Sequence, residues 1–447
     1  MFKKILIANR GEIAVRIIRA CHELGIAAVA IYSESDKESL HVKLADETYC
    51  IGKTSAKDTY LNMNSIIEVA IHSKSDAIHP GYGFLSESST FARACEEFNI
   101  CFIGPDYRII DSLGDKSNAK ETMKRADVPV VMGSEGEIED KDRAMEMAQK
   151  IGYPVIVKAS AGGGGKGMRV ARNREDLAVA IEESEKEAEN YFGNPAVYLE
   201  KYLEDTRHVE IQIIGDNYGN VVYLGERDCT IQRRHQKLLE ESPSPAMNDE
   251  LRKIMGNAAV RACRAVNYNS LGTVEFLLDS DNKFYFMEMN TRVQVEHGVT
   301  EMTTGIDLIK EQISIAEGKK LSFSQCDVKR NGCAIECRVN AENPYKNFIP
   351  SPGKINNYIA PGGIGIRIDS SVYSGYTIPP FYDSMISKVI AWGRDRNEAI
   401  ARMRRALDEF VIEGVDTTID FHKKLMQNDI FKSGNFNTKF LEKNNIL

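Results

Sequence analysis

The sequence lacks the features that would place the chain in a membrane or hold it together by disulfides. Its nine cysteines form no CxxC pair, and this scatter indicates reduced thiols in a cytosol rather than a disulfide framework or a zinc site. The apolar start is interrupted at Asn9 and Arg10, too early for a signal peptide. No apolar run is long enough to cross a bilayer. We therefore expect a cytoplasmic protein with no membrane partner.

A strong charge of one sign is also missing. The net charge is −8 over 447 residues, which argues against a general nucleic-acid binder. Hydrophobic residues make up 43% of the chain and charged residues 27%, as in ordinary soluble proteins. The length allows about three domains with ample cores.

A dinucleotide-binding fingerprint is absent from the first predicted βαβ unit. Residues 5–8 are typical of a buried strand, 13–24 of an amphipathic helix and 26–32 of a second strand. A dinucleotide domain would carry GxGxxG after the first strand, and Asn9-Arg10-Gly11 stands there instead. The N-terminal part is therefore predicted to be Rossmann-like without nicotinamide chemistry.

Two short loops of unusual composition follow predicted strands. In the first, glycines flank Tyr82; at the carboxyl edge of a sheet such a loop binds ligands, or it is simply a tight turn with a buried tyrosine. Both interpretations stay open from the residues alone. The second loop follows Lys158 and carries four consecutive glycines, Gly162, Gly163, Gly164 and Gly165.

Glycines without a Cβ allow backbone N–H groups to approach an anion, so the second loop is suited to phosphates. The GxxxxGK[ST] spacing of a P-loop is absent. A flexible linker is the alternative, but the run lies between two predicted strands. We interpret it as a phosphate-binding loop in a small α+β module of roughly 70 residues that could act as a lid.

The strongest pattern lies at the end of a predicted hairpin, where every second residue is charged or an amide: Glu288, Asn290, Arg292, Gln294 and Glu296. The period of two that a β-strand imposes would place these side chains on one face. If the preceding loop pairs Asp279 with Phe284, Glu275 lies opposite Glu288.

Opposed carboxylates repel each other, and a divalent cation between them relieves the repulsion. Two carboxylates and the Asn290 amide predict Mg²⁺ or Mn²⁺, completed by substrate phosphates. A solvated hairpin face is the plain alternative. Lys237, Arg292 and Gln294 could hold a small anion, with Glu296 beside it as a general base. Together with the glycine loop, these residues predict nucleotide-triphosphate chemistry.

Several blocks together resemble the biotin carboxylases of the ATP-grasp superfamily, a component of acetyl-CoA carboxylase and related biotin-dependent carboxylases. The resemblance spans nearly the whole chain, and no single block would be specific. The blocks are residues 7–14, 79–84, the glycine loop, 226–229, 232–237, 288–297 and 379–385.

The resemblance implies an α/β and α+β fold with ATP-grasp architecture. Residues 1–114 would form a Rossmann-like N-terminal domain, and residues 115–203 a connector with a small mobile lid domain. Residues 204–447 would form a large C-terminal domain built on antiparallel sheet.

The implied reaction has two steps. ATP phosphorylates bicarbonate to carboxyphosphate, and N1′ of biotin on a biotin carboxyl carrier protein captures its CO₂. The expected setting is acetyl-CoA carboxylase, in which a carboxyltransferase component forms malonyl-CoA for fatty acid synthesis; a pyruvate or other acyl-CoA carboxylase is the alternative. The carrier's Ala-Met-Lys-Met motif is absent, so biotin is expected on a separate protein. The family also implies a homodimer.

The matching motifs assign roles to individual residues. The metal would be held by Glu275, Glu288 and Asn290, and the phosphates would be contacted by Lys116, Lys158 and His235. The nucleotide pocket would be lined by Glu200, Lys201, Leu203, His208 and Gln232. Bicarbonate would be bound by Lys237, Arg292, Gln294 and the Val295 backbone and deprotonated by Glu296. The biotin ring would meet Arg338 and Tyr82.

Two other functions stay open at this point: a different ATP-grasp ligase, and a nucleotide-binding regulatory subunit without catalysis. One residue departs from the family pattern, because Gly298 stands where proline usually follows Glu-His. Proline restricts the backbone, so the glycine is expected to loosen the bicarbonate site. We expect Gly298→Pro to leave activity equal or higher.

Overall fold

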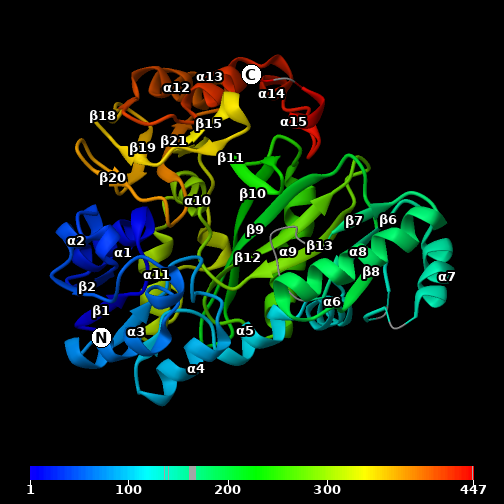
Figure 1. Cartoon of the computed structure of the whole chain (residues 1–447), viewed down its shortest axis with the longest axis horizontal. Coiled ribbons are helices and arrows are strands. Elements are labelled where there is room, and N and C mark those ends of the chain that lie inside the picture. The colour runs from blue at the N-terminus through cyan, green and yellow to red at the C-terminus, as the bar shows by residue number, and fades with distance from the viewer. Residues whose placement is uncertain (135, 139, 161–167, 445, 447) are drawn as a thin grey trace.

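The computed structural model describes residues 1–134, 136–138, 140–160, 168–444 and 446. The predicted phosphate loop, Gly162, Gly163, Gly164 and Gly165, lies outside these residues. In Figure 1 the N-terminal region lies at the lower left, a small three-stranded unit at the right, and the C-terminal helices at the top. The predicted combination of α/β and α+β regions is confirmed.

The N-terminal region is a parallel five-stranded sheet in the order β3-β2-β1-β4-β5. Its central strand contributes Ile5 and Ile7, which have no exposed surface, and α1 packs Ile13 and Ile17 against them. The predicted βαβ unit is confirmed. The elements are β1 (Lys4–Ile7), α1 (Gly11–Glu23), β2 (Ala27–Tyr32), α2 (Leu40–Leu44), β3 (Glu47–Cys50), α3 (Met63–Ser73), β4 (Ala77–His79), α4 (Ser89–Glu97), β5 (Cys101–Phe102) and α5 (Tyr107–Gly114).

The small unit is an antiparallel sheet in the order β7-β6-β8 with two helices on it. The helix before it, α6, begins at Lys116 because Asp115 caps its first turn, accepting a hydrogen bond from the Asn118 N–H at 2.7 Å. Whether this unit moves as a lid stays a prediction. Helix α6 spans Lys116–Arg125, and the elements of the small unit are α7 (Lys141–Ile151), β6 (Val155–Ala159), β7 (Arg169–Ala171), α8 (Arg174–Phe192) and β8 (Val197–Lys201).

The rest of the chain is organised around an antiparallel eight-stranded sheet in the order β13-β12-β9-β10-β11-β14-β21-β19. This order brings β14, late in the chain, beside β11, and β21 beside β14. The elements up to β14 are β9 (Arg207–Gly215), β10 (Val221–Arg233), β11 (Gln236–Ser242), α9 (Asp249–Ala265), β12 (Leu271–Leu278), β13 (Phe284–Asn290), α10 (His297–Thr304), α11 (Leu308–Ala316) and β14 (Cys333–Asn340).

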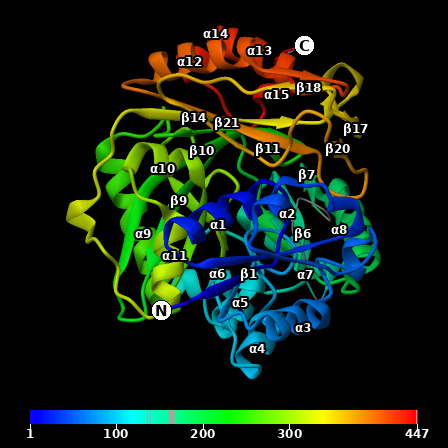
Figure 2. The same cartoon turned by 90° about the vertical axis from the view of Figure 1, so that its left-hand side faces the viewer.

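Helices α12 and α13 lie over the far end of this sheet, as Figure 2 shows from the side. Met403 of α12 and Val389 of β21 belong to the same buried core. The remaining elements are β15 (Glu342–Asn343), β16 (Ile349–Pro350), β17 (Gly353–Lys354), β18 (Asn357–Ile359), β19 (Ile366–Ser370), β20 (Thr377–Ile378), β21 (Met385–Gly393), α12 (Arg396–Glu409), β22 (Val411–Glu413), α13 (Ile419–Gln427), α14 (Asp429–Ser433) and α15 (Phe440–Lys443), with 3-10 turns at Glu34–Asp36, Ala56–Asp58, Gln325–Asp327 and Pro344–Lys346. Among the helices described, none combines the length and apolar content that crossing a membrane requires.

Candidate functional site

The acidic hairpin forms with a register that differs from the prediction. Strands β12 and β13 pair antiparallel, and Glu275 lies opposite Glu288 as predicted. The predicted pairing of Phe284 with Asp279 is wrong, because Phe284 pairs with Leu278. A β-bulge next to Glu275 adds one residue to β13 and restores the opposition. The predicted register is therefore wrong by one residue near the turn, and it is correct again beyond the bulge, from Glu275 to Thr273.

The predicted strand alternation is wrong beyond Asn290, where β13 ends. The chain is irregular from there to Glu296, the residue before α10. The polar side chains still converge, because Arg292 donates to Asn290 Oδ1 at 3.0 Å and to Gln294 Oε1 at 2.8 Å. Gln294 donates in turn to Glu275 at 3.0 Å. Hydrogen bonds, and not the strand period, bring this set together.

Three carboxylates lie in a row across neighbouring strands. Glu210 of β9 is opposite Glu275 of β12, and Glu275 is opposite Glu288 of β13. Glu210 and Glu275 are buried. The sequence analysis missed Glu210, although His208, Glu210 and Gln212 alternate with apolar residues as the hairpin does. That alternation in a buried strand is the signal that would have found it.

Lys237 is the cation in the middle of this row. Its Nζ lies 2.7 Å from Glu210, 3.0 Å from Glu275 and 2.6 Å from Glu296. Burial alone would lower the pKa of the ammonium, but the surrounding acidic groups raise it well above its ordinary value. Glu275 also lies 2.9 Å from His208 Nε2. Burial works against ionisation of Glu275, yet Lys237 and His208 keep its pKa below the ordinary value.

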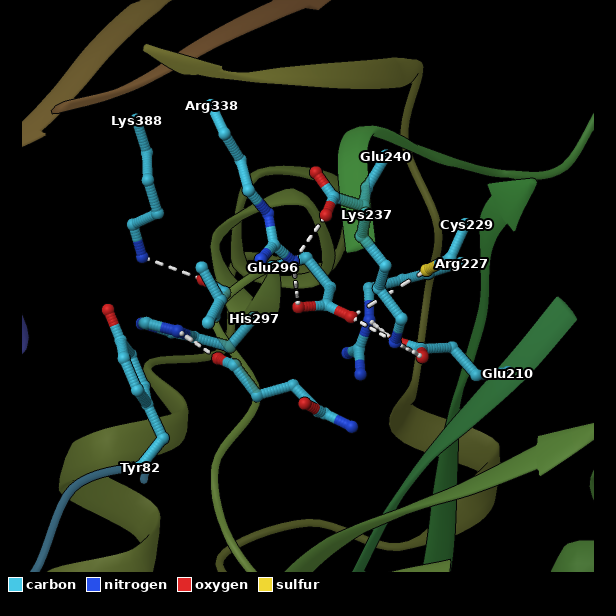
Figure 3. A network of polar contacts seen from close by, with 12 residues as sticks. Tyr82, Glu210, Arg227, Cys229, Lys237, Glu240, Glu296, His297, Arg338 and Lys388 are labelled. Atoms are coloured by element: carbon cyan, nitrogen blue, oxygen red, sulfur yellow. Dashed lines mark hydrogen bonds and ion pairs between the residues drawn. The ribbon is translucent and has the colours of Figure 1, made fainter. Parts of the chain in front are cut away.

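Glu296 is fully buried between two cations (Figure 3). Its carboxylate accepts from Lys237 at 2.6 Å and from Arg338 Nη2 at 3.0 Å. Burial favours the protonated form, but these cations hold the pKa of Glu296 well below its ordinary range. Arg338 also pairs with Glu240, whose pKa burial raises to about 7 against the opposing charge of Arg338. Cys229 points its Sγ at Glu296 from 3.7 Å.

We name two groups of charges. The acidic cluster contains five carboxylates and three permanent cations: Glu210, Glu240, Glu275, Glu288 and Glu296 with Arg227, Lys237 and Arg338. Arg227, the one of these cations not yet described, is fully buried, and its Nε lies 2.5 Å from Glu210 Oε1. The lysine cluster contains three lysines and one carboxylate: Lys116, Lys120, Lys158 and Glu200.

In the lysine cluster, Glu200 accepts from Lys158 Nζ at 2.5 Å and from Lys120 Nζ at 3.0 Å. Burial lowers the pKa of Lys116, and the nearby charge of Glu288 opposes that shift. Lys116 therefore lies between the two clusters. The sequence analysis missed Lys120, although it stands four residues after Lys116 and so shares its helix face.

The other residues predicted to line the nucleotide pocket do not all lie in one cluster. The Lys201 ammonium donates to the carbonyls of Gly152 at 2.9 Å and Tyr153 at 3.0 Å, so it does not enter the cluster. Strand β8 ends at Lys201, and Leu203 lies in the segment between β8 and β9. His208 Nδ1 lies 2.6 Å from Gln232 Nε2, next to the acidic row.

His235 stands apart from these buried groups. It is exposed in the two-residue turn between β10 and β11, where both Arg234 and His235 have positive φ angles of 49° and 64°. Such values suit the primed turn that closes a twisted hairpin, although glycine or asparagine usually occupies these positions. The turn thus holds two charged or polar side chains at the tip of the hairpin.

The Tyr82 loop is fixed to the N-terminal sheet. Asn9 donates to the carbonyls of Pro80 at 2.7 Å and Tyr82 at 2.8 Å, and the Tyr82 hydroxyl donates to Glu12. The segment that follows carries Glu87, which accepts from Arg292 Nε at 2.9 Å. The loop therefore borders the same site as Arg292.

The fold and these two opposed clusters define the class as an ATP-grasp ligase. Family models for three regions match in succession: the biotin carboxylase N-terminal domain over residues 1–110, the ATP-binding domain of carbamoyl-phosphate synthase L chain over 115–324, and the biotin carboxylase C-terminal domain over 336–443.

Similar proteins agree with these matches. Biotin carboxylase 1 of Bacillus subtilis is 62% identical over 443 residues, covering 99% of this chain and 98% of that protein. A pyruvate carboxylase subunit of Methanothermobacter thermautotrophicus is 55% identical, covering 99% of this chain and 90% of that protein. The biotin carboxylase domain of Hydrogenobacter thermophilus 2-oxoglutarate carboxylase, solved as a dimer with MgADP and bicarbonate, has a TM-score of 0.96 at 52% identity and covers 99% of this chain and 98% of that chain.

The chain belongs to the biotin carboxylase family. The resemblance inferred from its motifs is confirmed, as is the ATP-grasp architecture. It is an ATP-dependent biotin carboxylase ligase, which decides against the two other functions left open by the sequence.

Proposed function

We propose that the protein carboxylates biotin on a separate biotin carboxyl carrier protein, using ATP and bicarbonate with carboxyphosphate as the intermediate. We further propose that it works in the cytoplasm as the biotin carboxylase subunit of acetyl-CoA carboxylase, whose product malonyl-CoA serves fatty acid synthesis. The observation that carries the proposal is the buried Glu296 carboxylate, held 2.6 Å from Lys237 and 3.0 Å from Arg338. This arrangement places a base beside two anion-binding cations.

The metal ion of this reaction, Mg²⁺ or Mn²⁺, fits Glu275, Glu288 and Asn290. Within the described part of the chain, the Glu288 carboxylate has no hydrogen bond or ion pair, and burial together with the charge of Glu275 raises its pKa. A hard divalent cation favours such oxygen ligands and would relieve the repulsion. When bound, it neutralises charge that develops on the phosphates.

Lys116 and Lys158 are the proposed phosphate contacts in the lysine cluster. Three ammonium groups around the single carboxylate of Glu200 leave positive charge in surplus, and such a surplus attracts phosphate. His235 would meet the phosphates from the exposed hairpin turn. We assign the nucleotide pocket to Glu200, Lys201, Leu203, His208 and Gln232.

Glu296 is proposed to take the proton of bicarbonate. Lys237, Arg292, Gln294 and the Val295 backbone would bind the anion, and the deprotonated oxygen would then attack the terminal phosphorus of ATP, with ADP leaving. In the structure, Glu296 itself forms ion pairs with two nearby cations, Lys237 and Arg338. When Lys237 turns towards the bound anion, Glu296 loses part of its counter-charge and its pKa rises, which makes it a stronger base.

Arg338 and Tyr82 are proposed to meet the biotin ring, because Arg338 contacts Glu296 and Tyr82 is joined through Glu12 and Lys388 to the Val295 carbonyl. Arg338 would stabilise negative charge that develops on the ureido group during CO₂ capture. Tyr82 is held by Glu12 at the neighbouring edge of the N-terminal sheet. Glu296 and biotin would therefore share Arg338 in successive steps.

The first experiment measures ATP hydrolysis by the purified protein with Mg²⁺, bicarbonate and free biotin. We expect turnover that requires bicarbonate and rises with biotin. Glu296→Gln should lower the rate by about 10²- to 10⁴-fold, the contribution of a positioned general base, while ATP binding persists. Hydrolysis that ignores bicarbonate and biotin, or an active Glu296→Gln variant, would overturn the proposal.

The carboxyl acceptor is a separate question. The relatives found above from pyruvate carboxylase and 2-oxoglutarate carboxylase support a second candidate, the biotin carboxylase component of an enzyme acting on pyruvate or another acceptor. Capture of the biotinylated carrier and its carboxyltransferase component, followed by an assay with acetyl-CoA and pyruvate, separates the two. We also propose a homodimer, supported by the dimer of the Hydrogenobacter domain; sedimentation at the mass of one chain would contradict it.

A further inference from the structure

Lys388 is a buried cation that the roles above leave without a function. It lies in β21 directly opposite Arg338 of β14, and its side chain has no exposed surface. A fully buried lysine is rare and costly unless its charge is paired. Because paired residues on neighbouring strands share a face, Lys388 points to the same side of the sheet as Arg338.

The contacts of Lys388 are uneven in length. Its Nζ donates to the Val295 carbonyl at 2.7 Å, lies 3.1 Å from Glu12 Oε1 and 3.7 Å from Asp369 Oδ2. Burial alone would lower the pKa of this ammonium, but the charges of Glu12 and its other acidic neighbours raise it. The lysine is therefore charged, and its shortest contact is with a neutral backbone group instead of a carboxylate.

That carbonyl belongs to the peptide that joins Val295 to Glu296. The preceding carbonyl, of Gln294, accepts from His297 Nδ1 at 2.8 Å. The backbone on the N-terminal side of Glu296 is thus held at two consecutive carbonyls. Its side chain is held by Arg338 at 3.0 Å. Figure 3 shows Lys388 and Arg338 side by side, both directed towards this segment.

We propose that Lys388 is a positioning residue for Glu296. Arg338 and Lys388, neighbours on two strands, hold Glu296 in different ways, since Arg338 fixes the carboxylate and Lys388 fixes the peptide from which the carboxylate extends. Glu12 compensates the charge of Lys388 and accepts a second hydrogen bond from Tyr82, so the same ion pair ties the Tyr82 loop to the Glu296 segment. The inference rests on the proposed role of Glu296.

A simple Lys388→Met variant would leave Glu12 buried without its cation and could fail to fold. The test therefore compares Glu12→Gln with the double variant Glu12→Gln/Lys388→Met, in which neither charge remains. Both are assayed for bicarbonate-dependent ATP hydrolysis at one fixed biotin concentration. We expect the added Lys388→Met change to lower kcat/KM for bicarbonate by about 10- to 100-fold, because a base displaced by about an ångström loses that much. KM for ATP should stay unchanged.

Arg396→Met is the matched control. Arg396 also joins a buried carboxylate, Glu241 at 2.6 Å, to backbone carbonyls, those of Phe431 at 2.9 Å and Lys432 at 2.8 Å. These contacts hold α14, away from Glu296. This variant should lose thermal stability and keep the kinetic constants for bicarbonate and ATP.

The outcomes separate the inference from the proposed function. If the wild-type protein shows no bicarbonate-dependent hydrolysis, the role of Glu296 fails and the inference fails with it. If the wild type is active and the double variant matches Glu12→Gln in kcat/KM for bicarbonate, the inference alone is overturned. The same holds if KM for ATP changes as much as KM for bicarbonate, because Lys388 would then act on the fold as a whole.

Discussion

The two clusters of the site carry opposite surpluses of charge. In the acidic cluster five carboxylates meet three permanent cations, and Glu288 is the carboxylate without an ion pair among the described residues. In the lysine cluster Lys120 and Lys158 form ion pairs with the single carboxylate of Glu200, and the charge of Lys116 interacts with it as well. Lys116 lies where the two meet, since its charge interacts with both Glu288 and Glu200.

The difference shows how one fold prepares a place for a cation and a place for phosphates. Each surplus is costly in a buried site unless a ligand of opposite charge balances it. The acidic cluster rests on a continuous antiparallel sheet, so all its groups except Glu296 are held by paired strands. The lysine cluster draws on α6, which packs against the large sheet, and on β6 and β8 of the small unit. A nucleotide with its metal ion would balance both surpluses at once.

The largest test removes the central cation of the acidic cluster. Lys237→Met leaves Glu210, Glu275 and Glu296 without it, and breaking a buried ion pair costs about 3–5 kcal/mol. We expect the free energy of unfolding, measured by urea denaturation, to fall by that amount. Added Mg²⁺ should stabilise the variant more than the wild type, because the variant has more unpaired carboxylates.

Lys186→Met is the control for that measurement. Lys186 forms an ion pair with Glu182 at 2.7 Å on the exposed face of α8, and such surface pairs contribute little. A Lys237→Met variant that unfolds no more easily than Lys186→Met, or gains nothing from Mg²⁺, would show that the acidic cluster is not an ionic network.

The second test reduces the surplus in the lysine cluster. A hydrogen bond to a charged group contributes about 1.5–3 kcal/mol, so Lys158→Met should weaken ATP binding by roughly 10- to 100-fold. Lys120→Met, on the same carboxylate, should weaken it less, because Lys158 lies near the end of β6, the strand that precedes the glycine loop in the sequence. Titration calorimetry measures both; equal effects would mean that only the total charge matters.

The third test uses pH on the acidic cluster. Burial raises the pKa of Glu240 from its ordinary value of 4.5 to about 7, so the folded protein binds this proton more tightly than the unfolded chain does. The stability from Glu240 is therefore fully present below pH 4.5 and is lost as the pH rises through 7, about 3 kcal/mol in total.

Glu240→Gln should remove that part of the pH dependence. Urea denaturation of both proteins between pH 4.5 and 8 gives the difference in slope directly. Wild-type and variant curves that run parallel over this range would mean that Glu240 is ionised throughout, with Arg338 outweighing burial.

The smallest effect is expected at Gly298, in the first turn of α10. A Cβ there would lie 2.3 Å from Ile390 Cδ1, the flexible end of that side chain. We expect Gly298→Pro to keep activity equal or higher once Ile390 shifts, and Gly298→Pro/Ile390→Val to be more stable than the single variant, because the overlap is gone. A large fall in bicarbonate-dependent hydrolysis would contradict this.

Much of the fold was readable from local patterns. The βαβ unit followed from strand and helix periods, and the opposition of Glu275 and Glu288 followed from the alternation on each side of a turn. The exact pairing did not, because nothing local in the sequence marks the bulge beside Glu275. The path after Asn290 was misjudged for a related reason: alternating polar residues suit a strand and equally suit a segment tied by side-chain hydrogen bonds.

The site was less predictable wherever a residue acts through a distant partner. Glu210 stood in a readable alternation, but Lys388 and Glu12 are single charges in otherwise ordinary elements. Their meeting depends on the N-terminal helix α1 packing near the last strands of the large sheet. Residues as far apart in the sequence as Glu12 and Lys388 share no local pattern, so their contact could be seen only in the tertiary structure.

The sequence by itself determined which residues alternate and where turns and helices begin. It also determined which charged side chains lie on each face of a strand. The tertiary structure alone decided which faces meet. Period and turn chemistry are local properties, whereas the order β13-β12-β9-β10-β11-β14-β21-β19 results from packing of the whole chain. That order sets Lys237 against Glu296 and places Arg338 and Lys388 side by side, one on the Glu296 carboxylate and the other on the peptide before it.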